Sequence, residues 1–283
     1  MTLSTIQTPS GMFTIAPFDH RGSLAQSLGI DISTPEGKQV LQQLKTYFMQ
    51  LFSPLCSGVL VDPEFGFPTL DYKADGCGLI LTLESSGYND EKTAVPTLMQ
   101  NWGVEGVKNN YAVAKLLIYY HPQEQHAEEK QKLVMELAAS CRKEEVPFLL
   151  EPVLFHPSGK GELTKAEFQD AQLQACQELQ PYCDILKIQY PGDALACATM
   201  TAEMDVPWIL LSRGMNYDEF HEALRISLEN GAKGFAAGRS VWQEISSFKQ
   251  PNGQPDMSAI YEFLKTTGVT RMKELVALTE AAV

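Results

Sequence analysis

The sequence predicts an α/β protein whose eight parallel strands close into a (β/α)8 barrel, or TIM barrel. Two observations carry this prediction. Eight short β-type runs alternate with polar or helical segments, which is the pattern of parallel strands joined by crossovers. The chain has 283 residues, and a barrel uses about 250 residues as one domain. No GxGxxG motif follows the first run, which disfavours a dinucleotide-binding sheet. We therefore expect a single domain over residues 1–283, with an N-terminal extension at 1–12.

The strands are predicted where short, mostly apolar runs stand between turn or helix signals. They cover residues 13–19, 58–62, 79–84, 115–120, 148–151, 185–190, 208–212 and 234–239. The clearest helical patterns cover residues 35–51, 123–145, 164–180, 218–230 and 258–279. Thr164 with Glu167 is a capping-box pattern, Pro35 suits a first helical turn, and Asn230-Gly231 ends the helix before the last strand. Residues 85–110, rich in Gly, Asn and Pro, predict a long loop with one short helix, at the rim of the barrel or as a lid.

The charge of the chain excludes two classes of partner. Its 22 basic and 35 acidic side chains give a net charge of −13, which argues against binding to nucleic acid or to an anionic membrane. An anionic substrate would need a local cationic pocket. No stretch approaches the ~18 apolar residues of a membrane span, and the N-terminus lacks a secretory pattern.

Cysteine and histidine usage predicts a cytoplasmic protein without a metal site or another cofactor. The six cysteines stand at irregular spacings with no CxxC pair, so reduced thiols are the simplest account. The five histidines are scattered, and only His20 stands among the candidate site residues. A metal-dependent aldolase would need histidines at several strand ends.

Acidic residues close four of the predicted strands. In a barrel of this kind the active site lies at the carboxyl ends of the strands, where Asp19, Asp62, Glu84 and Glu151 stand. Three of them have an alternative explanation. Asp19 could cap a loop, Asp62 before Pro63 could stabilise a turn, and Glu84 could be a solvated loop residue. As a set, they predict a site, because perturbed ionisable groups concentrate there.

Lys187 stands in the middle of the sixth strand, in the stretch 184–191. Alternation places it on the face of Ile185 and Gln189, so burying that face buries the lysine. Burial disfavours the ammonium and leaves a neutral amine that can attack a carbonyl. The alternative is an edge-strand lysine that reaches water, but a closed barrel has no edge.

Lys115 opens the fourth strand, on the same face as Leu117 and Tyr119. If that face is the barrel interior, two lysines share one pocket, and a like charge favours the neutral form of the reactive amine. The alternative is a lysine at the amino end of the strand that reaches solvent at the barrel bottom.

The last two strands predict a phosphate site. Strand seven runs through Ser212 into Arg213-Gly214, and strand eight runs through Gly238 into Arg239. Glycines let backbone N–H groups approach a phosphate, and such barrels hold phosphate in these loops. Arginine adds a planar bidentate donor. A single Gly-Arg-Ser could be an ordinary turn, but two consecutive loops of this kind favour the functional interpretation.

These motifs together resemble the class I tagatose 1,6-bisphosphate aldolase family, including the related sulfofructose-phosphate aldolases. The resemblance runs through nearly the whole chain and rests on Asp19-His20-Arg21-Gly22, Leu60-Val61-Asp62-Pro63-Glu64, the run from Lys115 to Tyr120, Glu151-Pro152, Asp184 to Pro191 with Lys187, Leu211-Ser212-Arg213-Gly214 and Ala237-Gly238-Arg239-Ser240-Val241-Trp242. It implies a metal-independent barrel enzyme that forms a Schiff base with a ketose phosphate and releases dihydroxyacetone phosphate.

The resemblance also implies roles for individual residues. Lys187 matches the Schiff-base lysine, Glu151 the acid/base glutamate, Asp19 the aspartate beside the substrate hydroxyls and Lys115 a second lysine near the first. The phosphate-binding loops match Ser212, Gly214, Gly238 and Arg239. Further substrate-binding candidates are His20, Arg21, Asp62, Glu84, Gln189 and Arg213. The chain departs from the family at three of these positions: His20 replaces an amide, Gln189 a glutamate and Arg213 a small residue.

The sequence thus predicts a lyase that cleaves a six-carbon ketose 1-phosphate, either tagatose 1,6-bisphosphate or 6-deoxy-6-sulfofructose 1-phosphate. Two alternatives stay open: an isomerase or epimerase that uses no Schiff base, and a non-catalytic sugar-phosphate sensor. We expect a homo-oligomer whose partner is a small sugar phosphate.

Overall fold

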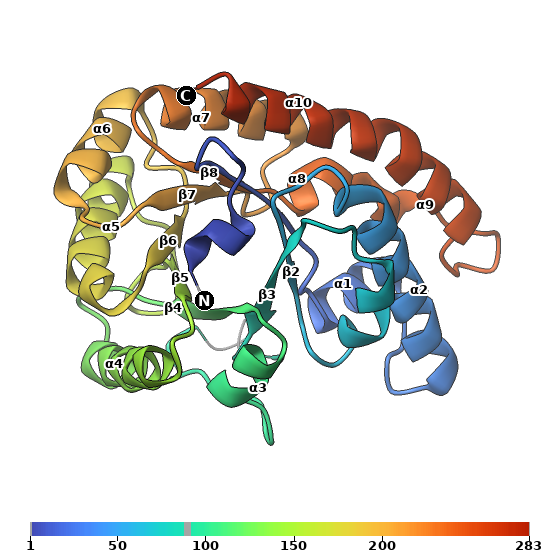
Figure 1. The fold of residues 1–283 in the computed structure, drawn as a ribbon, viewed down its shortest axis with the longest axis horizontal. Coiled ribbons are helices and arrows are strands. Elements are labelled where there is room, and N and C mark those ends of the chain that lie inside the picture. The colour runs from blue at the N-terminus through green and yellow to red at the C-terminus, as the bar shows by residue number, and fades with distance from the viewer. Residues whose placement is uncertain (1, 88–91, 283) are drawn as a thin grey trace.

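The computed structural model, which describes residues 2–87 and 92–282, is a closed barrel of eight parallel strands in the order β1 to β8 (Figure 1). The strands are β1 Phe13–Pro17, β2 Gly58–Val61, β3 Gly78–Thr82, β4 Val113–Tyr119, β5 Phe148–Val153, β6 Ile185–Ile188, β7 Trp208–Leu211 and β8 Gly234–Ala236. The barrel closes where Phe13 of β1 pairs with Gly234 of β8. The fold prediction is confirmed, and each predicted strand coincides with an observed one to within a few residues.

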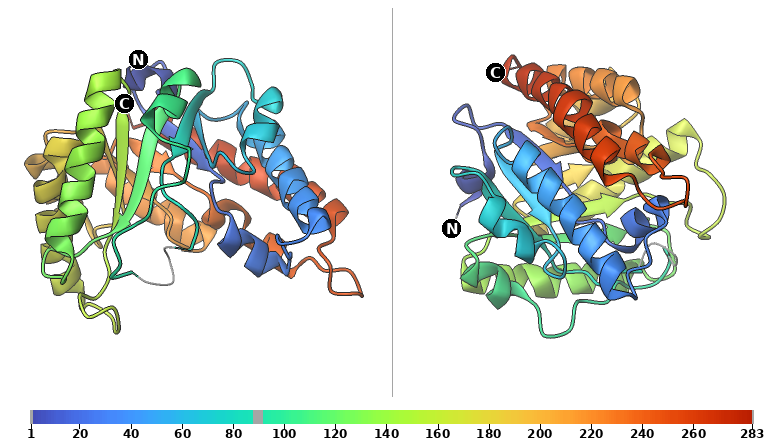
Figure 2. Two further views of the ribbon diagram at one scale, coloured as in Figure 1. Left: turned by 90° about the horizontal axis from the view of Figure 1, so that it is seen from below. Right: turned by 90° about the vertical axis from the view of Figure 1, so that its right-hand side faces the viewer.

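Helices surround the ring of strands, as the two views of Figure 2 show. They are α1 Gly22–Leu28, α2 Pro35–Phe52, α3 Val104–Asn109, α4 Ala127–Glu144, α5 Lys165–Leu179, α6 Ala194–Glu203, α7 Tyr217–Glu229, α8 Arg239–Trp242, α9 Met257–Phe263 and α10 Val269–Glu280. A π-helical turn, Leu264–Gly268, joins α9 to α10, so the predicted helix 258–279 is nearly continuous. The capping box of Thr164 and Glu167 is present. None of the described helices has the length and apolarity needed to cross a lipid bilayer.

Three helix predictions need correction. The helix expected from residue 123 begins at Ala127. The residues before it form a turn instead, in which the Glu124 N–H donates to the His121 carbonyl. The helices α1 and α6 were not predicted. In α6 the segment Ala194–Glu203 is apolar and small without a clear 3.6-residue stripe, and its start is fixed by the Asp193 side chain, which accepts from the Ala196 N–H.

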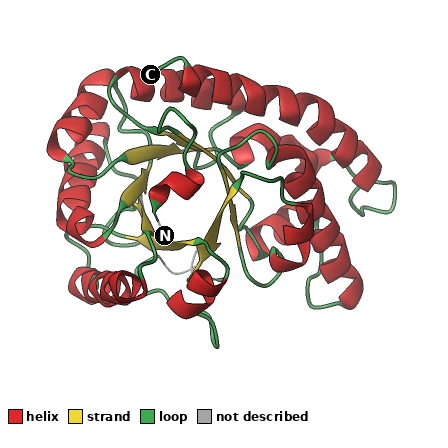
Figure 3. Cartoon of the chain, viewed as in Figure 1, coloured by secondary structure: helices red, strands yellow, loops and turns green. Residues whose placement is uncertain are grey.

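The barrel interior is built in layers. One apolar layer includes Ile15, Leu60, Leu149 and Ile185, and Ile6 packs against it from below. Ile6 belongs to a 3₁₀ helix, Leu3–Ile6, that lies inside the ring of strands in Figure 3. The N-terminal extension therefore closes the bottom of the barrel. The opposite, carboxyl end of the barrel is left for ionisable side chains.

Candidate active site

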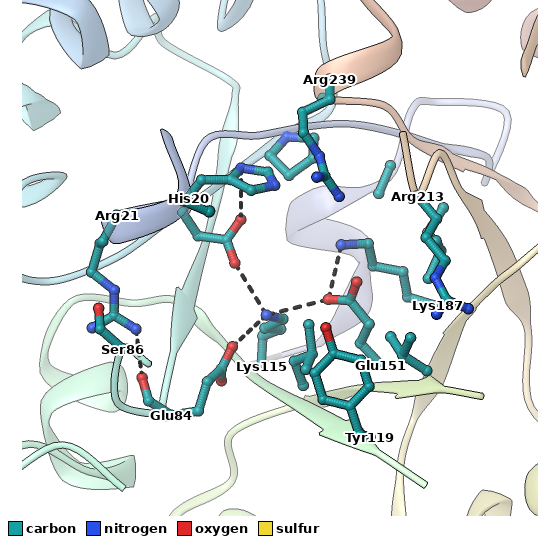
Figure 4. Close-up of a pocket in the computed structure, with 18 of the residues that line it drawn as sticks. His20, Arg21, Glu84, Ser86, Lys115, Tyr119, Glu151, Lys187, Arg213 and Arg239 are labelled. Carbon is teal, nitrogen blue, oxygen red and sulfur yellow. Dashed lines mark hydrogen bonds and ion pairs between the residues drawn. The ribbon is translucent and has the colours of Figure 1, made fainter. Parts of the chain in front are cut away.

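A cavity of about 440 Å³ opens at the carboxyl ends of the strands (Figure 4). It lies directly above the apolar layer, because three of its side chains stand two residues beyond interior apolar ones. Lys115 follows Val113, Glu151 follows Leu149, and Lys187 follows Ile185 along their strands. Of the fourteen residues predicted for the site, the following line the cavity: Asp19, His20, Arg21, Glu84, Lys115, Glu151, Lys187, Ser212, Arg213, Gly238 and Arg239.

Lys187 faces the barrel interior, as alternation predicts. It is the third residue of β6 and is only 5% exposed, while Leu186 and Ile188 on either side pack outward in the cluster between sheet and helices. Its Nζ lies 2.9 Å from Glu151 Oε2. Because the barrel is closed, the alternative of an edge-strand lysine is wrong.

Lys115 lies at the centre of three carboxylates. Its Nζ is 3.1 Å from Asp19 Oδ2, 2.5 Å from Glu84 Oε1 and 3.2 Å from Glu151 Oε2. The side chain is 1% exposed, so the alternative of a lysine that reaches solvent at the barrel bottom is wrong. Glu151 Oε2 bridges the two lysines, which lie on opposite sides of it in Figure 4.

The electrostatics of this cluster fix two charges. Burial alone would lower the pKa of Lys115, but the carboxylates of Asp19, Glu84 and Glu151 outweigh it and raise the pKa well above its usual value. Burial likewise opposes ionisation of Asp19, yet the neighbouring cation of Lys115 holds its pKa below the ordinary range. The raised pKa favours the cationic form of Lys115, which contacts all three carboxyl groups, a role that the sequence did not indicate.

The Asp19 carboxylate makes stability pH-dependent. Its pKa lies below the unfolded value of about 3.9, so its contribution is complete above about pH 5 and is lost progressively as the pH falls from there toward the lower pKa of the folded state. We expect the loss of unfolding free energy between pH 6 and pH 3 to be about 1 kcal/mol smaller in Asp19→Asn than in the wild type. Urea unfolding at both pH values measures this, with the exposed Asp170→Asn as control. Equal losses in all three proteins would contradict the assignment.

Cationic groups stand around the other side of the cavity. Arg239, at the start of α8, lines it and forms no ion pair within residues 2–87 and 92–282. Arg213 has a left-handed backbone, with φ of 38°, and its Nη1 donates to the Leu154 carbonyl at 2.9 Å. Arg21 is engaged in the protein, because its Nη2 donates to the Glu84 carbonyl at 2.7 Å and so holds the loop after β3.

Three predicted residues are absent from the cavity lining. Gly214 follows Arg213 in a turn and lies outside it. Gln189 is buried in the wall, where its Oε1 accepts a 2.6 Å hydrogen bond from the Leu154 N–H. Asp62 is fully buried and pairs with Lys45 of α2, while its second oxygen accepts from the Phe65 N–H. The structure therefore does not bring Asp62, Gln189 or Gly214 into the cavity lining, and the side chains of Asp62 and Gln189 connect neighbouring segments of the protein instead.

The buried pair of Lys45 and Asp62 should show strong coupling in unfolding experiments. Both side chains are 0% exposed, so removing one leaves an unpaired buried charge. We expect Lys45→Met and Asp62→Leu each to cost about 3–5 kcal/mol of unfolding free energy, and the double variant to cost much less than their sum. A double-variant cycle by urea denaturation measures the coupling. Strictly additive costs would contradict the pairing.

The sequence missed several residues of the cavity. Tyr119 lines it, and the signal was present, since Tyr119 shares a strand face with Lys115. Ser85, Ser86 and Lys92 contribute from the predicted loop 85–110, whose short helix is α3. Residues 88–91 of that loop lie outside the described residues. An isolated antiparallel β-bridge between Glu84 and Leu98 holds this loop in place.

Comparison with known proteins relates the chain to aldolases. A family model described as DeoC/LacD family aldolase matches residues 13–244. Tagatose 1,6-diphosphate aldolase 2 of Streptococcus pyogenes serotype M1 is 26% identical over 298 residues, which cover 94% of this chain and 90% of the relative. Tagatose 1,6-diphosphate aldolase of Staphylococcus haemolyticus is 25% identical over 306 residues, covering 97% and 93%.

Solved structures share the fold. An archaeal fructose 1,6-bisphosphate aldolase superposes with a TM-score of 0.66 at 18% identity, covering 99% of this chain and 98% of that one. A Schiff-base-forming fructose-1,6-bisphosphate aldolase superposes with a TM-score of 0.65 at 19% identity, covering 98% of both chains.

Proposed function

The chain belongs to the DeoC/LacD aldolase family, and on that premise we propose that it cleaves a six-carbon ketose 1-phosphate through a Schiff base on Lys187. Its products are dihydroxyacetone phosphate and a three-carbon aldehyde, and the reaction is reversible. The observation that carries the proposal is the contact of 2.9 Å between Lys187 Nζ and Glu151 Oε2 inside a buried cavity. An amine and a proton carrier at this distance are what imine chemistry requires.

The proposed reaction begins with attack of the neutral Lys187 amine on C2 of the open-chain ketose. As the C–N bond forms, the amine proton passes through Glu151 to the C2 oxygen and gives the carbinolamine. Glu151, protonated from solvent, then protonates the carbinolamine hydroxyl, which leaves as water, so that an iminium ion and the Glu151 carboxylate result. Glu151 then takes the proton of the C4 hydroxyl. The C3–C4 bond breaks, and its electron pair passes into the iminium ion, giving an enamine and the aldehyde. Protonation at C3 and hydrolysis release dihydroxyacetone phosphate and restore the Lys187 amine.

Lys115 and its carboxylates support this chemistry in two ways. The fixed cation 3.2 Å from Glu151 Oε2 holds that carboxylate against Lys187. Asp19, held by the same cation at 3.1 Å, is available for hydrogen bonds from substrate hydroxyls. The ammonium stands where three carboxylates converge, which supports a reaction without a metal ion.

We propose that the C1 phosphate binds at the ends of β7 and β8. Ser212, Gly238 and Arg239 line the cavity there, and Arg239 supplies a bidentate donor. Gly238 lets this loop pack closely against the end of β1, because a Cβ at that position would lie 2.9 Å from the Pro17 carbonyl oxygen. The proposed phosphate site is therefore supported by the Arg239 cation, which can neutralise a phosphate, and by close packing of the loop that only glycine at position 238 permits.

Tagatose 1,6-bisphosphate is the first candidate substrate, because the curated relatives carry its name. 6-Deoxy-6-sulfofructose 1-phosphate is the second, because Lys92 and Arg213 in the cavity lining suit either anion at C6. Family membership favours cleavage over isomerisation and over a silent sensor. A homo-oligomer and a cytoplasmic location stay predictions, the latter supported by six cysteines that are all unpaired.

A substrate panel tests the proposed specificity. Tagatose 1,6-bisphosphate, fructose 1,6-bisphosphate and 6-deoxy-6-sulfofructose 1-phosphate are each supplied, and dihydroxyacetone phosphate is followed through glycerol-3-phosphate dehydrogenase. We expect release from at least one of the two candidates, with rates unchanged by EDTA. Loss of activity in EDTA, or rearranged sugars without dihydroxyacetone phosphate, would contradict the proposal.

A further inference from the structure

His20 stands between the ionisable cluster and the proposed phosphate loop. It follows Asp19 in the turn after β1, and its side chain, 23% exposed, lines the cavity. The ring packs edge-on against Trp242 of α8, with centroids 5.8 Å apart at 87°. Its Nδ1 is buried and has no hydrogen-bond partner within the described residues. A buried polar nitrogen without a partner is costly and calls for an explanation.

The imidazole faces the loop that carries Arg239. A Cβ built on Gly238 would lie 3.6 Å from His20 Cε1, so the ring borders the space that a side chain at this position would fill. Both ring nitrogens flank Cε1, and Figure 4 shows His20 and Arg239 at the same end of the cavity. An anion held by Gly238 and Arg239 would therefore lie beside the imidazole.

The charges that face His20 keep the ring neutral in the absence of an anion. Burial lowers the pKa of His20 to about 4. Asp19, whose Oδ1 is 3.9 Å from Nδ1, opposes this effect, whereas Arg239, Lys187 and Lys45 reinforce it. A dianion on the Arg239 side would change the balance, because two negative charges at about 5 Å favour the imidazolium by roughly a hundredfold or more.

We propose that His20 is an anion ligand that takes up a proton when the phosphate of the substrate binds beside Gly238 and Arg239. The imidazolium would lie between the Asp19 carboxylate and the phosphate, and both nitrogens would then act as donors. This inference rests on the proposed function, since it uses the phosphate site at β8. It adds a property that glutamine or asparagine at this position could not supply, namely anion affinity that rises as the pH falls.

The protonation state of His20 can be observed directly by NMR of protein labelled with ¹³C-histidine. Sulfate is the probe, because it stays a dianion between pH 5 and 8. The chain has only five histidines, and the Cε1–H signal of His20 is the one missing from His20→Gln. At pH 6 we expect sulfate to move this signal to the imidazolium position. His121→Asn, which changes a buried histidine outside the cavity lining, is the matched control and should leave that shift unchanged.

Affinity supplies the second readout. The sulfate dissociation constant of the wild type should fall by up to about tenfold per pH unit as the pH decreases from 7 toward 5, and most of this dependence should be lost in His20→Gln. A His20 signal that stays at the neutral position under saturating sulfate would overturn the inference. So would the absence of sulfate binding in the cavity. Borohydride trapping on Lys187 does not depend on His20, so these failures would leave the proposed function intact.

Discussion

Replacing Lys187 by methionine is expected to abolish carbon–carbon cleavage, with a loss in kcat of roughly 10⁴-fold or more. In the proposed mechanism, Lys187 is the residue that forms a covalent bond with the substrate. Lys115, which contacts the same Glu151 carboxylate, cannot replace it easily, because it is held as a cation by three carboxylates. Methionine keeps the length of the side chain in a site that is only 5% exposed, so the fold should persist.

The experiment compares kcat and circular dichroism for Lys187→Met and for Lys132→Met. Lys132 is a matched control, since its side chain on α4 is 77% exposed and far from the chemistry. The control should turn over at the wild-type rate. Substantial cleavage by a folded Lys187→Met protein would show that the nucleophile lies elsewhere.

Replacing Glu151 by glutamine is expected to lower kcat by about 10²- to 10⁴-fold, the usual contribution of general acid–base catalysis. The amide keeps the shape of the side chain between Lys187 and Lys115 but can carry no proton between amine, carbinolamine and C4 hydroxyl. Imine formation should slow as well, because loss of water from the carbinolamine needs an acid. Single-turnover kinetics separate the two steps.

Glu128→Gln is the control for this change, because Glu128 is an exposed carboxylate on α4. It should retain the wild-type rate. If Glu151→Gln also retained it, the general base would have to be one of the other carboxylates around Lys115, and Asp19 and Glu84 would be the residues to change next.

The sequence predicted the barrel well because its signals are local. Each strand is a short apolar run. Hydrogen bonds to the neighbouring strand on each side fix its register, so successive side chains point alternately into the barrel and toward the helices. For the same reason the inward direction of Lys187 and Glu151 could be predicted: both stand inside their strands, two residues beyond the interior residues Ile185 and Leu149.

Alternation stops predicting direction where a strand ends. Asp62 and Gln189 share the parity of interior residues, but each lies one residue beyond its strand and turns to another partner. Glu84 also lies beyond its strand, yet its bridge to Leu98 keeps the backbone extended and the side chain in the cavity. These outcomes depend on tertiary partners such as Lys45 of α2, which no local pattern identifies.

The charge of Lys115 could not be predicted either. Two lysines in one pocket suggested mutual repulsion as the main effect. The structure surrounds Lys115 with Glu151 of β5 and with Asp19 and Glu84, which follow β1 and β3, so its first effect is to hold carboxylates in place. Only closure of the barrel brings these strand ends together.

The most direct test of the account is reductive trapping of the Schiff base. The protein is incubated with dihydroxyacetone phosphate and sodium borohydride, digested and mapped by mass spectrometry. The account predicts a reduced adduct on the peptide that contains Lys187, and no adduct on Lys115 or in Lys187→Met. An adduct on Lys115, or turnover by an enzyme that borohydride and dihydroxyacetone phosphate never modify, would contradict it.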